Sequence, residues 1–308
     1  MPFFSVIIPT YNRAHLIEKA VKSLLNQTFN DFEIIIVDDA SSDNTEDVVK
    51  KINATCISYI KNQTNQERCI TRNIGINASK GKYICFLDSD DYHLPHHLES
   101  LYKLIISKNE PKAFFFTNAW NETENGERSE RVCPDFESTE LYTYFLHFTV
   151  NPQRWCVHRE ILTENPFNPD VIICEDMDTS LRIAAKGYPI YQLKERTTVY
   201  VAASDSFTYG DSMKWEKELF YLKRIFKQKE LIGKLKSSEK NRLLSMCYFH
   251  LSQKSHALNN KFLTIFLGIK SFLKYPKGYN GKTNKILLFS IIDCIPLIRF
   301  FLNRIRKI

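Results

Sequence analysis

The sequence lacks several features that mark secreted or membrane-spanning proteins. None of its eight cysteines forms a C-x-x-C pair, and free thiols in a reducing cytosol are the simplest account of them. The segment Met1-Pro2-Phe3-Phe4 leads directly into an apolar run without a basic stretch, so we expect no signal peptide. No stretch reaches the roughly 18 uncharged residues that a spanning helix needs. We therefore expect a cytoplasmic protein that either stays in solution or lies peripherally on the inner face of the cytoplasmic membrane.

Internal repeats and low-complexity tracts are also absent, which excludes fibrous and repeat architectures. Hydrophobic residues make up 44% and charged residues 25% of the chain, as in ordinary globular proteins. Acidic residues are scarce only toward the C-terminus: residues 211–308 hold 21 Lys/Arg and 6 Asp/Glu, a net charge of +15. Residues 1–210 hold 21 Lys/Arg and 29 Asp/Glu, a net charge of −8. The two parts are expected to face different partners.

The first 92 residues alternate apolar runs with helical patterns. Strands are expected over residues 4–8, 33–37, 56–60 and 83–87, with helices between them. This alternation predicts βαβ units and a mostly parallel sheet covered by helices on both faces. In such sheets ligands bind beyond the carboxyl ends of the strands.

The rest of the chain is less regular. A strand is expected over residues 113–117, a polar loop over 118–134, and a helix that ends near Gly187. Strand patterns disappear after about Trp215, where Lys-rich helical patterns begin. We expect a domain over residues 1–210, with a nucleotide-binding half (1–92) and an acceptor half (93–210), followed by a basic helical region over 211–308.

Three of the predicted strands end in polar residues that suit a nucleotide and a metal ion. These are Thr10-Tyr11-Asn12-Arg13, Asp38-Asp39 and Asp88-Ser89-Asp90-Asp91. A tyrosine ring can stack on a base, and a carboxylate can accept hydrogen bonds from base N–H groups or ribose hydroxyls. A divalent cation held by carboxylate oxygens neutralises the charge of a diphosphate. The alternative is that the acidic run is a solvated loop or a helix cap; its place directly after a buried strand favours the metal site.

Together these segments resemble glycosyltransferase family 2, whose members are inverting enzymes with the GT-A fold. The resemblance rests on Ser5 to Arg13, Ile36 to Asp43 and Phe86 to Asp91, with Glu175-Asp176 as a fourth motif. It covers roughly residues 4–208. It implies a metal-dependent transfer of a sugar from a nucleotide-diphosphate donor, UDP-linked by expectation, to a carbohydrate hydroxyl.

The resemblance also implies roles for individual residues. Asp90 matches the ligand of a Mn²⁺ or Mg²⁺ ion. Arg72 matches a basic residue near the nucleotide, although a salt bridge on a helix surface is the alternative. The implied donor-binding residues are Pro9, Thr10, Tyr11, Arg13, Asp39, Arg72, Asp88 and Ser89.

The catalytic base is expected in the fourth motif. Asp176 matches the family's base, and Glu175 is the second candidate. Both are also first-turn helix acids of the kind that the helix dipole favours. Trp155 falls where similar enzymes build their acceptor pocket, but a core tryptophan is an equal alternative.

One stretch departs from the family pattern. Similar enzymes carry Tyr-Arg-x-His-x-x-Ser after the base, whereas Val201 and Ala203 stand here in the places of Arg and His. The leaving group must then be stabilised by the metal and by other groups, such as Arg72 or residues of the basic region. His93, His96 and His97 follow the acidic run, but we expect ordinary surface or interface histidines there rather than a zinc site.

The basic region offers two interpretations. Residues 261–274 place Phe262, Ile265, Phe266, Ile269, Phe272 and Leu273 on one helical face, and residues 286–302 are more apolar still. Apolar faces with a +15 charge suit peripheral contact of residues 261–308 with an anionic membrane, and then a lipid-linked oligosaccharide as acceptor in bacterial surface-polysaccharide assembly. The alternative is packing on the catalytic domain or in a homodimer. No nucleic-acid module accompanies the charge.

Two other functions remain open from the sequence. A nucleotidyltransferase on a similar fold is one alternative. It would be expected to carry a glycine-rich loop after the first strand, and Pro9-Thr10-Tyr11-Asn12 has no glycine. A non-catalytic member that binds nucleotide sugars or acts as a scaffold stays possible because the downstream His and Arg are missing.

Overall fold

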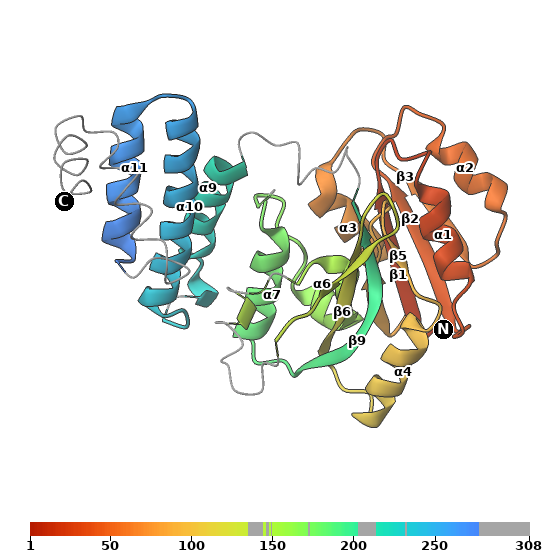
Figure 1. The fold of residues 1–308 in the computed structure, drawn as a ribbon. Coiled ribbons are helices and arrows are strands. Elements are labelled where there is room, and N and C mark those ends of the chain that lie inside the picture. Colours follow the sequence, from red (N-terminus) through yellow and green to blue (C-terminus); the bar gives the residue numbers. More distant parts are fainter. Residues whose placement is uncertain are drawn as a thin grey trace. The chain divides into compact units, whose positions relative to one another are not determined.

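The structure is a computed structural model that describes residues 1–134, 144–145, 148, 150–171, 173–202, 214–231 and 233–276. The chain divides into two compact units, Met1–Gly210 and Asp211–Ile308. Figure 1 shows the elements of both units along the chain.

The first unit is built on a nine-stranded sheet with β7 paired to β6 and the order β3-β2-β1-β4-β8-β6-β9-β5. Six of these described strands run in one direction, and β5, β7 and β8 run in the other. The strands are β1 (Phe4–Thr10), β2 (Phe32–Asp38), β3 (Ile57–Lys61), β4 (Tyr83–Phe86), β5 (Tyr92–His93), β6 (Phe114–Glu122), β7 (Arg128–Arg131), β8 (Trp155–His158) and β9 (Ile190–Val201). The predicted α/β fold with a mostly parallel sheet is confirmed.

Helices cover both faces of the sheet because the strands are apolar on both sides. Val6, Ile8, Ile34 and Ile36 pack with buried residues of α1 and α4. On the other face α3 approaches β1 so closely that a Cβ atom on Gly75 would lie 2.5 Å from Cγ2 of Ile7. The helices that the structure describes in this unit are α1 (Ile17–Leu25), α2 (Thr45–Ile52), α3 (Glu67–Ala78), α4 (His97–Ser107), η1 (Pro152–Arg154), α6 (Arg159–Glu164) and α7 (Glu175–Ala185).

The predicted loop over residues 118–134 is wrong in part. Strand β6 continues to Glu122 and pairs antiparallel with β7, and Gly126 takes a φ of +81° in the turn between them. The strand signal is hidden in the sequence because this hairpin is largely exposed and polar, so it lacks the apolar alternation of a half-buried strand. As a result, Arg131 sits on a defined strand.

The second unit is helical where the structure describes it. Its elements are α9 (Lys214–Ile225), η2 (Lys229–Leu231), α10 (Ser237–Ala257) and α11 (Lys261–Lys274). Helix α11 buries small residues against α10, with Ser271 hydrogen-bonded to Ser245 and the Thr264 carbonyl accepting from Ser252. Its aromatic face is exposed. None of the described helices is long and apolar enough to cross a membrane. The apolar stretch 286–302 lies outside the described residues.

Candidate active site

A cavity of about 330 Å³ opens at the carboxyl ends of β1, β2 and β4, and we call it the strand-end cavity. Its volume lies in the range of small-molecule sites. All eight residues expected from the family resemblance to bind the donor line it, together with Asp90. The lining residues are Pro9, Thr10, Tyr11, Arg13, Asp39, Asn65, Glu67, Arg68, Thr71, Arg72, Asp88, Ser89 and Asp90.

The two adjacent aspartates at the end of β2, Asp38 and Asp39, have different contacts. Asp38 is fully buried, and its carboxylate accepts hydrogen bonds from the backbone N–H of Ser41 and the hydroxyl of Tyr59, which hold the turn. Asp39 lines the cavity, and its Oδ1 accepts from Nδ2 of Asn62 and the N–H of Gln66, both at 2.8 Å. Asp39 is therefore held in place beside the cavity by a fixed pair of donors.

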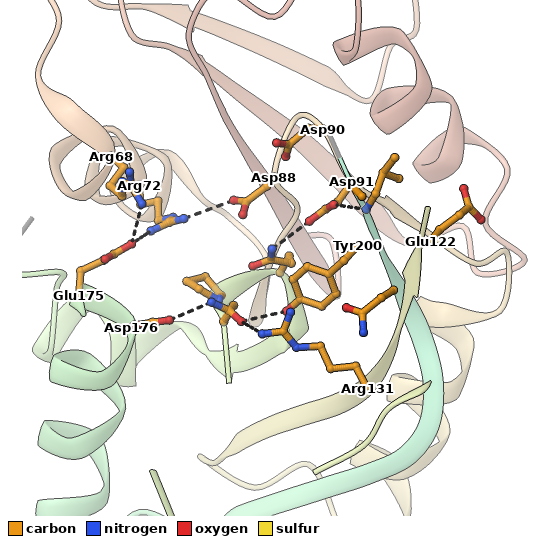
Figure 2. Close-up of a pocket in the computed structure, with 16 residues that line it drawn as sticks. Arg68, Arg72, Asp88, Asp90, Asp91, Glu122, Arg131, Glu175, Asp176 and Tyr200 are labelled. Carbon is orange, nitrogen blue, oxygen red and sulfur yellow. Dashed lines mark hydrogen bonds and ion pairs between the residues drawn. The ribbon is translucent and has the colours of Figure 1, made fainter. Parts of the chain in front are cut away.

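A second cavity of about 310 Å³ adjoins the first, and we call it the acidic cavity (Figure 2). It shares Arg68, Arg72, Asp88 and Asp90 with the strand-end cavity. Its other lining residues are Asp91, Asn121, Glu122, Arg131, Asn151, Pro152, Gln153, Glu175, Asp176, Tyr200, Val201 and Ala202. Both candidate bases therefore lie in a cavity that borders the predicted donor site.

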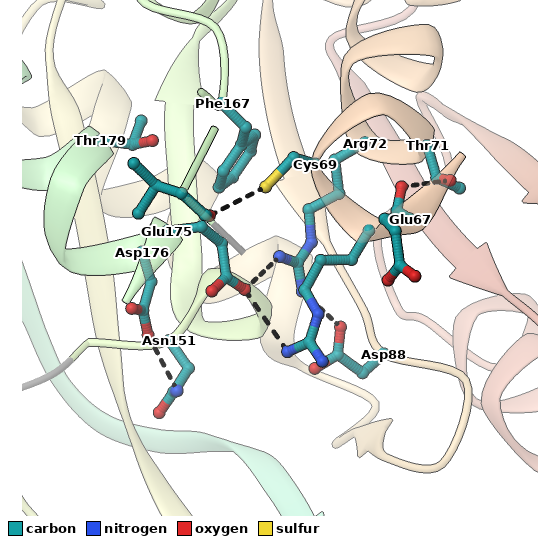
Figure 3. A network of polar contacts seen from close by, with 12 residues as sticks. Glu67, Cys69, Thr71, Arg72, Asp88, Asn151, Phe167, Glu175, Asp176 and Thr179 are labelled. Carbon is teal, nitrogen blue, oxygen red and sulfur yellow. Dashed lines mark hydrogen bonds and ion pairs between the residues drawn. The ribbon is translucent and has the colours of Figure 1, made fainter. Parts of the chain in front are cut away.

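Arg72 links the acidic run to α7 (Figure 3). Its Nη1 lies 2.9 Å from Oε1 of Glu175, and its Nη2 lies 3.3 Å from Oδ1 of Asp88. Burial lowers the pKa of Arg72, but the carboxylates of Asp88 and Glu175 outweigh that effect and hold its pKa above the ordinary value. The alternative of a surface salt bridge is wrong for Arg72, since its side chain is only 5% exposed.

Asp176 lies in the first turn of α7, and its environment differs from that of Glu175. Its Oδ1 accepts from the N–H of Met177 at 2.7 Å, and its Oδ2 accepts from Nδ2 of Asn151 at 3.1 Å. Burial, followed by the neighbouring Glu175 carboxylate, raises the pKa of Asp176 to about 7. A carboxylate with a pKa near neutrality is suited to take up a proton in catalysis.

The acidic run itself can hold a cation. One carboxylate oxygen from each of Asp88, Asp90 and Asp91 lies within 4.8 Å of the others. Asp91 is anchored, with Oδ1 accepting from the N–H of Val201 and Oδ2 from Nε2 of Gln153, each at 2.9 Å. Burial, then the charges of Asp90 and Asp88, raises the pKa of Asp91. Hard oxygen donors that repel one another fit a divalent cation such as Mn²⁺ or Mg²⁺.

The structure differs from the sequence expectations for Trp155 and for two of the histidines. Trp155 does not reach either cavity: its side chain is fully buried between Phe86 and Phe114, and its Nε1 donates to the Val150 carbonyl, as in the core alternative. His93 and His97 are not surface residues. Both are buried, and their rings are stacked with centroids 3.6 Å apart. Burial is tolerated because one ring nitrogen of each hydrogen-bonds inside the protein, that of His93 to the Gln153 carbonyl and that of His97 to the Thr197 hydroxyl. Burial also lowers the pKa of each histidine.

The structure also adds residues that sequence reasoning missed. Arg68 borders both cavities and lies 3.7 Å from Oε1 of Glu175. Its spacing of four from Arg72 on one helix was the available signal. Asn151, Gln153 and Arg131 line the acidic cavity without any local motif. Tyr200 also lines it and stands in the place of the tyrosine of the family's Tyr-Arg-x-His-x-x-Ser stretch. Val201 lines this cavity as well, whereas Ala203 lies outside the described residues.

Two adjoining cavities lined by charged residues at the carboxyl ends of the strands suit an enzyme that binds a small molecule. Comparison with known proteins gives the family. The model of "Glycosyl transferase family 2" matches residues 5–162. The chain belongs to this family and is a glycosyltransferase.

Relatives agree with this assignment, and solved structures share the fold. An uncharacterised glycosyltransferase of Methanocaldococcus jannaschii is 31% identical over 63% of this chain and 69% of that protein. The GalNAc(5)-diNAcBac-PP-undecaprenol β-1,3-glucosyltransferase of Campylobacter jejuni is 42% identical over 40% of each chain. TarS of S. aureus in complex with UDP-GlcNAc is similar with a TM-score of 0.64, 18% identity and coverage of 99% and 92%. A mannosyltransferase of Pyrobaculum calidifontis with GDP-Man and Mn²⁺ has a TM-score of 0.62, 17% identity and coverage of 97% and 83%. At these identities the structures establish the fold.

Proposed function

We propose that this glycosyltransferase moves a sugar from a UDP-sugar to a carbohydrate hydroxyl with inversion at the anomeric carbon. One observation carries the proposal. The predicted donor-binding residues share a cavity that borders the acidic cavity of Asp176 through Arg68, Arg72, Asp88 and Asp90. Donor and base are then adjacent, with the charged groups between them where a diphosphate would lie.

The strand-end cavity supplies contacts for a nucleoside. Tyr11 lines this cavity and is 47% exposed, so its ring can stack on a base. Asp39 offers carboxylate oxygens to base N–H or ribose hydroxyls. Thr10 lines the same cavity, and its Oγ1 is buried without a hydrogen-bond partner among the described residues. The similar structure of TarS is a complex with UDP-GlcNAc.

Asp90 is the proposed ligand of a Mn²⁺ or Mg²⁺ ion. Its carboxylate borders both cavities and has an oxygen within 4.8 Å of carboxylate oxygens of Asp88 and Asp91. When bound, the cation supplies positive charge to the diphosphate. Arg68 and Arg72 supply further positive charge on the same side, in place of the missing downstream His and Arg.

Asp176 is the proposed general base, with Glu175 committed to Arg72. The acceptor hydroxyl gives its proton to Asp176 as its oxygen attacks the anomeric carbon. The bond from that carbon to the diphosphate oxygen breaks on the opposite face, and UDP leaves with the bonding electrons. One carboxylate suffices for inversion.

The acceptor is proposed to be a glycan linked to a membrane lipid, in bacterial polysaccharide assembly. The name of the Campylobacter relative specifies an undecaprenol-linked oligosaccharide. Helix α11 exposes an apolar face next to lysines, with Phe262 82%, Phe266 45% and Leu273 72% exposed. Together with the +15 charge of residues 211–308, this face suits an anionic lipid surface.

Vesicle sedimentation tests the membrane contact. The full chain should sediment with phosphatidylglycerol vesicles and not with phosphatidylcholine vesicles, and Phe262→Glu with Phe266→Glu should abolish the effect. Phe220→Glu on α9, where the ring is 54% exposed, is the matched control. If the double variant instead dissociates a dimer and leaves sedimentation unchanged, the membrane contact is wrong.

Donor binding and turnover test the proposed function. A UDP-sugar should raise the melting temperature, more so with Mn²⁺, and the enzyme should release UDP slowly from it. Asp39→Asn should remove most of the thermal shift, while Asp47→Asn on the exposed face of α2 should leave it unchanged. A protein that binds a UDP-sugar but turns over no donor with any acceptor would be a non-catalytic member of the family.

A further inference from the structure

Asn151 lies between the proposed base and the sheet. Its Nδ2 is 3.1 Å from Oδ2 of Asp176 (Figure 3). Its Oδ1 lies 3.0 Å from Nη2 of Arg131 and 3.3 Å from the hydroxyl of Tyr200. Figure 2 shows Arg131 and Tyr200 on the side of the acidic cavity that faces Asp176, and the Arg131 guanidinium lies 4.3 Å from the centre of the Tyr200 ring. Of these residues, only Tyr200 falls in a stretch that resembles a family motif.

Arg131 and Tyr200 determine the orientation of the Asn151 side-chain amide. The guanidinium of Arg131 can only donate hydrogen bonds, so the atom that faces it must be the oxygen. Burial raises the pKa of Tyr200, so its hydroxyl stays protonated and can donate as well. With its oxygen taken by these groups, Asn151 presents its N–H to Asp176. A rotated amide would present its oxygen to Asp176 and its NH₂ group to a cation.

The backbone around Asn151 is also constrained. Pro152 follows it and disfavours the helical conformation at Asn151, which has φ −67° and ψ 155°. Its carbonyl accepts from the N–H of Arg154 at 3.0 Å, and Gln153 binds Asp91. The same short segment therefore contacts both the base and the acidic run.

We propose that Asn151, held by Arg131 and Tyr200, is a positioning residue that keeps the Asp176 carboxylate ionised and oriented in the acidic cavity. This inference rests on the proposed role of Asp176 as base. A hydrogen bond to the charged form of a carboxylate favours that form, and so offsets part of the cost of burial. Each oxygen of Asp176 accepts one hydrogen bond from the protein and can accept another from an acceptor hydroxyl.

Other charges near Asp176 must be held constant in the test. Glu175 lies on its own helix, Arg68 and Arg72 lie on α3, and Arg131 and Tyr200 come from the sheet. Asp88, Asp90, Asp91 and Glu122 line the same cavity. Asn151→Ala removes the hydrogen bond without changing any charge. Arg131→Met removes a charge and a donor together, whereas Arg131→Lys keeps the charge.

The test is the pH dependence of kcat for UDP release. In Asn151→Ala the midpoint of the acidic limb should rise by about half to one pH unit, the effect of one hydrogen bond. Arg131→Met should give a similar rise, and Arg131→Lys a smaller one. Tyr200→Phe, which removes a single hydroxyl, should shift the limb least. KM for the donor should not change, because none of these three residues lines the strand-end cavity.

Arg128→Met is the control, since Arg128 lies on the same strand and bonds Glu122 and Tyr92 rather than Asn151. A loss of rate that is equal at every pH, or an unshifted limb in both Asn151→Ala and Tyr200→Phe, overturns the positioning role. A wild-type enzyme without activity would instead contradict the proposed function. Full activity in Asp176→Asn would contradict the assignment of Asp176 as base. Failure of the positioning role, of the proposed function and of the base assignment can therefore be told apart.

Discussion

Arg72 on α3 donates from Nη1 to Oε1 of Glu175 on α7 at 2.9 Å, across 103 positions of the chain. The two side chains are 5% and 7% exposed. The contact ties the helix beside the strand-end cavity to the helix that carries the proposed base. It also gives two adjacent carboxylates different roles. Glu175 neutralises the buried guanidinium of Arg72, whereas Asp176 accepts its hydrogen bonds from uncharged donors, Asn151 and the N–H of Met177.

Removal of Arg72 should be costly because it leaves buried carboxylates without their counter-charge. We expect Arg72→Met to lower the free energy of unfolding by about 3–5 kcal/mol, measured by urea denaturation. Arg68→Met is the matched control: its ion pair to Glu175 spans 3.7 Å and its side chain is 32% exposed, so a loss below about 1 kcal/mol is expected. Adding Glu175→Gln to Arg72→Met should recover part of the stability. Equal effects of the two arginine variants would contradict this account.

The raised pKa of Asp176 predicts how stability changes with pH. The unfolded chain releases this proton near pH 3.9, and the folded protein holds it until about pH 7. Between these values the folded state binds more protons, so this group lowers stability as pH rises, by at most about 1.4 kcal/mol per pH unit. Asp176→Asn cannot titrate. Its stability relative to wild type should therefore grow between pH 4 and 7 and level off above pH 7.

Asp43 provides a comparison, because its pKa is shifted in the opposite direction and its effect on the pH dependence of stability has the opposite sign. Burial acts to raise the pKa of Asp43, but hydrogen bonds from Thr45 and Ala14 outweigh it and lower that pKa. The wild type should therefore be favoured over Asp43→Asn at neutral pH, and this advantage should shrink as the pH falls below 4. Parallel pH curves for wild type and Asp176→Asn would contradict the raised pKa of Asp176.

Asp90 and Asp91 should respond differently to loss of charge. Asp90→Asn should abolish the extra thermal shift that Mn²⁺ gives in the presence of a UDP-sugar, and should change the melting temperature of the protein alone less than Asp91→Asn does, because Asp90 is only half-buried. Asp91→Asn should lower that melting temperature, because its carboxylate accepts from Gln153 and Val201 inside the protein. An undiminished Mn²⁺ effect in Asp90→Asn would exclude it as a ligand.

The position of Arg72 depends on how closely α3 lies to the sheet. A Cβ atom on Gly75 would lie 2.5 Å from Cγ2 of Ile7, so Gly75→Ala should cost about 1–3 kcal/mol in urea denaturation. The cost should fall in an Ile7→Ala background, which removes the clashing methyl group. The same cost in both backgrounds would mean that this contact does not set the spacing.

The parallel part of the fold was predictable because its strands are continuous apolar runs with clear helical patterns between them. The clustering of Thr10, Asp39 and Asp88 followed from the rule that carboxyl ends of parallel strands share one edge. The β6–β7 hairpin was missed because its exposed polar residues carry no period. Asn151, Arg131 and Tyr200 could not be predicted as a group, since their contacts join segments that only the folded sheet brings together. Trp155 was a candidate for the acceptor pocket because it lies near a motif, but an aromatic residue in such a place can equally belong to the core.

The most direct test of the central claim is the rate of UDP release from a UDP-sugar by Asp176→Asn and by wild type at pH 8. A general base contributes about 10²–10⁴-fold, so the variant should be slower by that factor while its affinity for the donor is unchanged. Undiminished turnover in Asp176→Asn would contradict the assignment of Asp176 as the base.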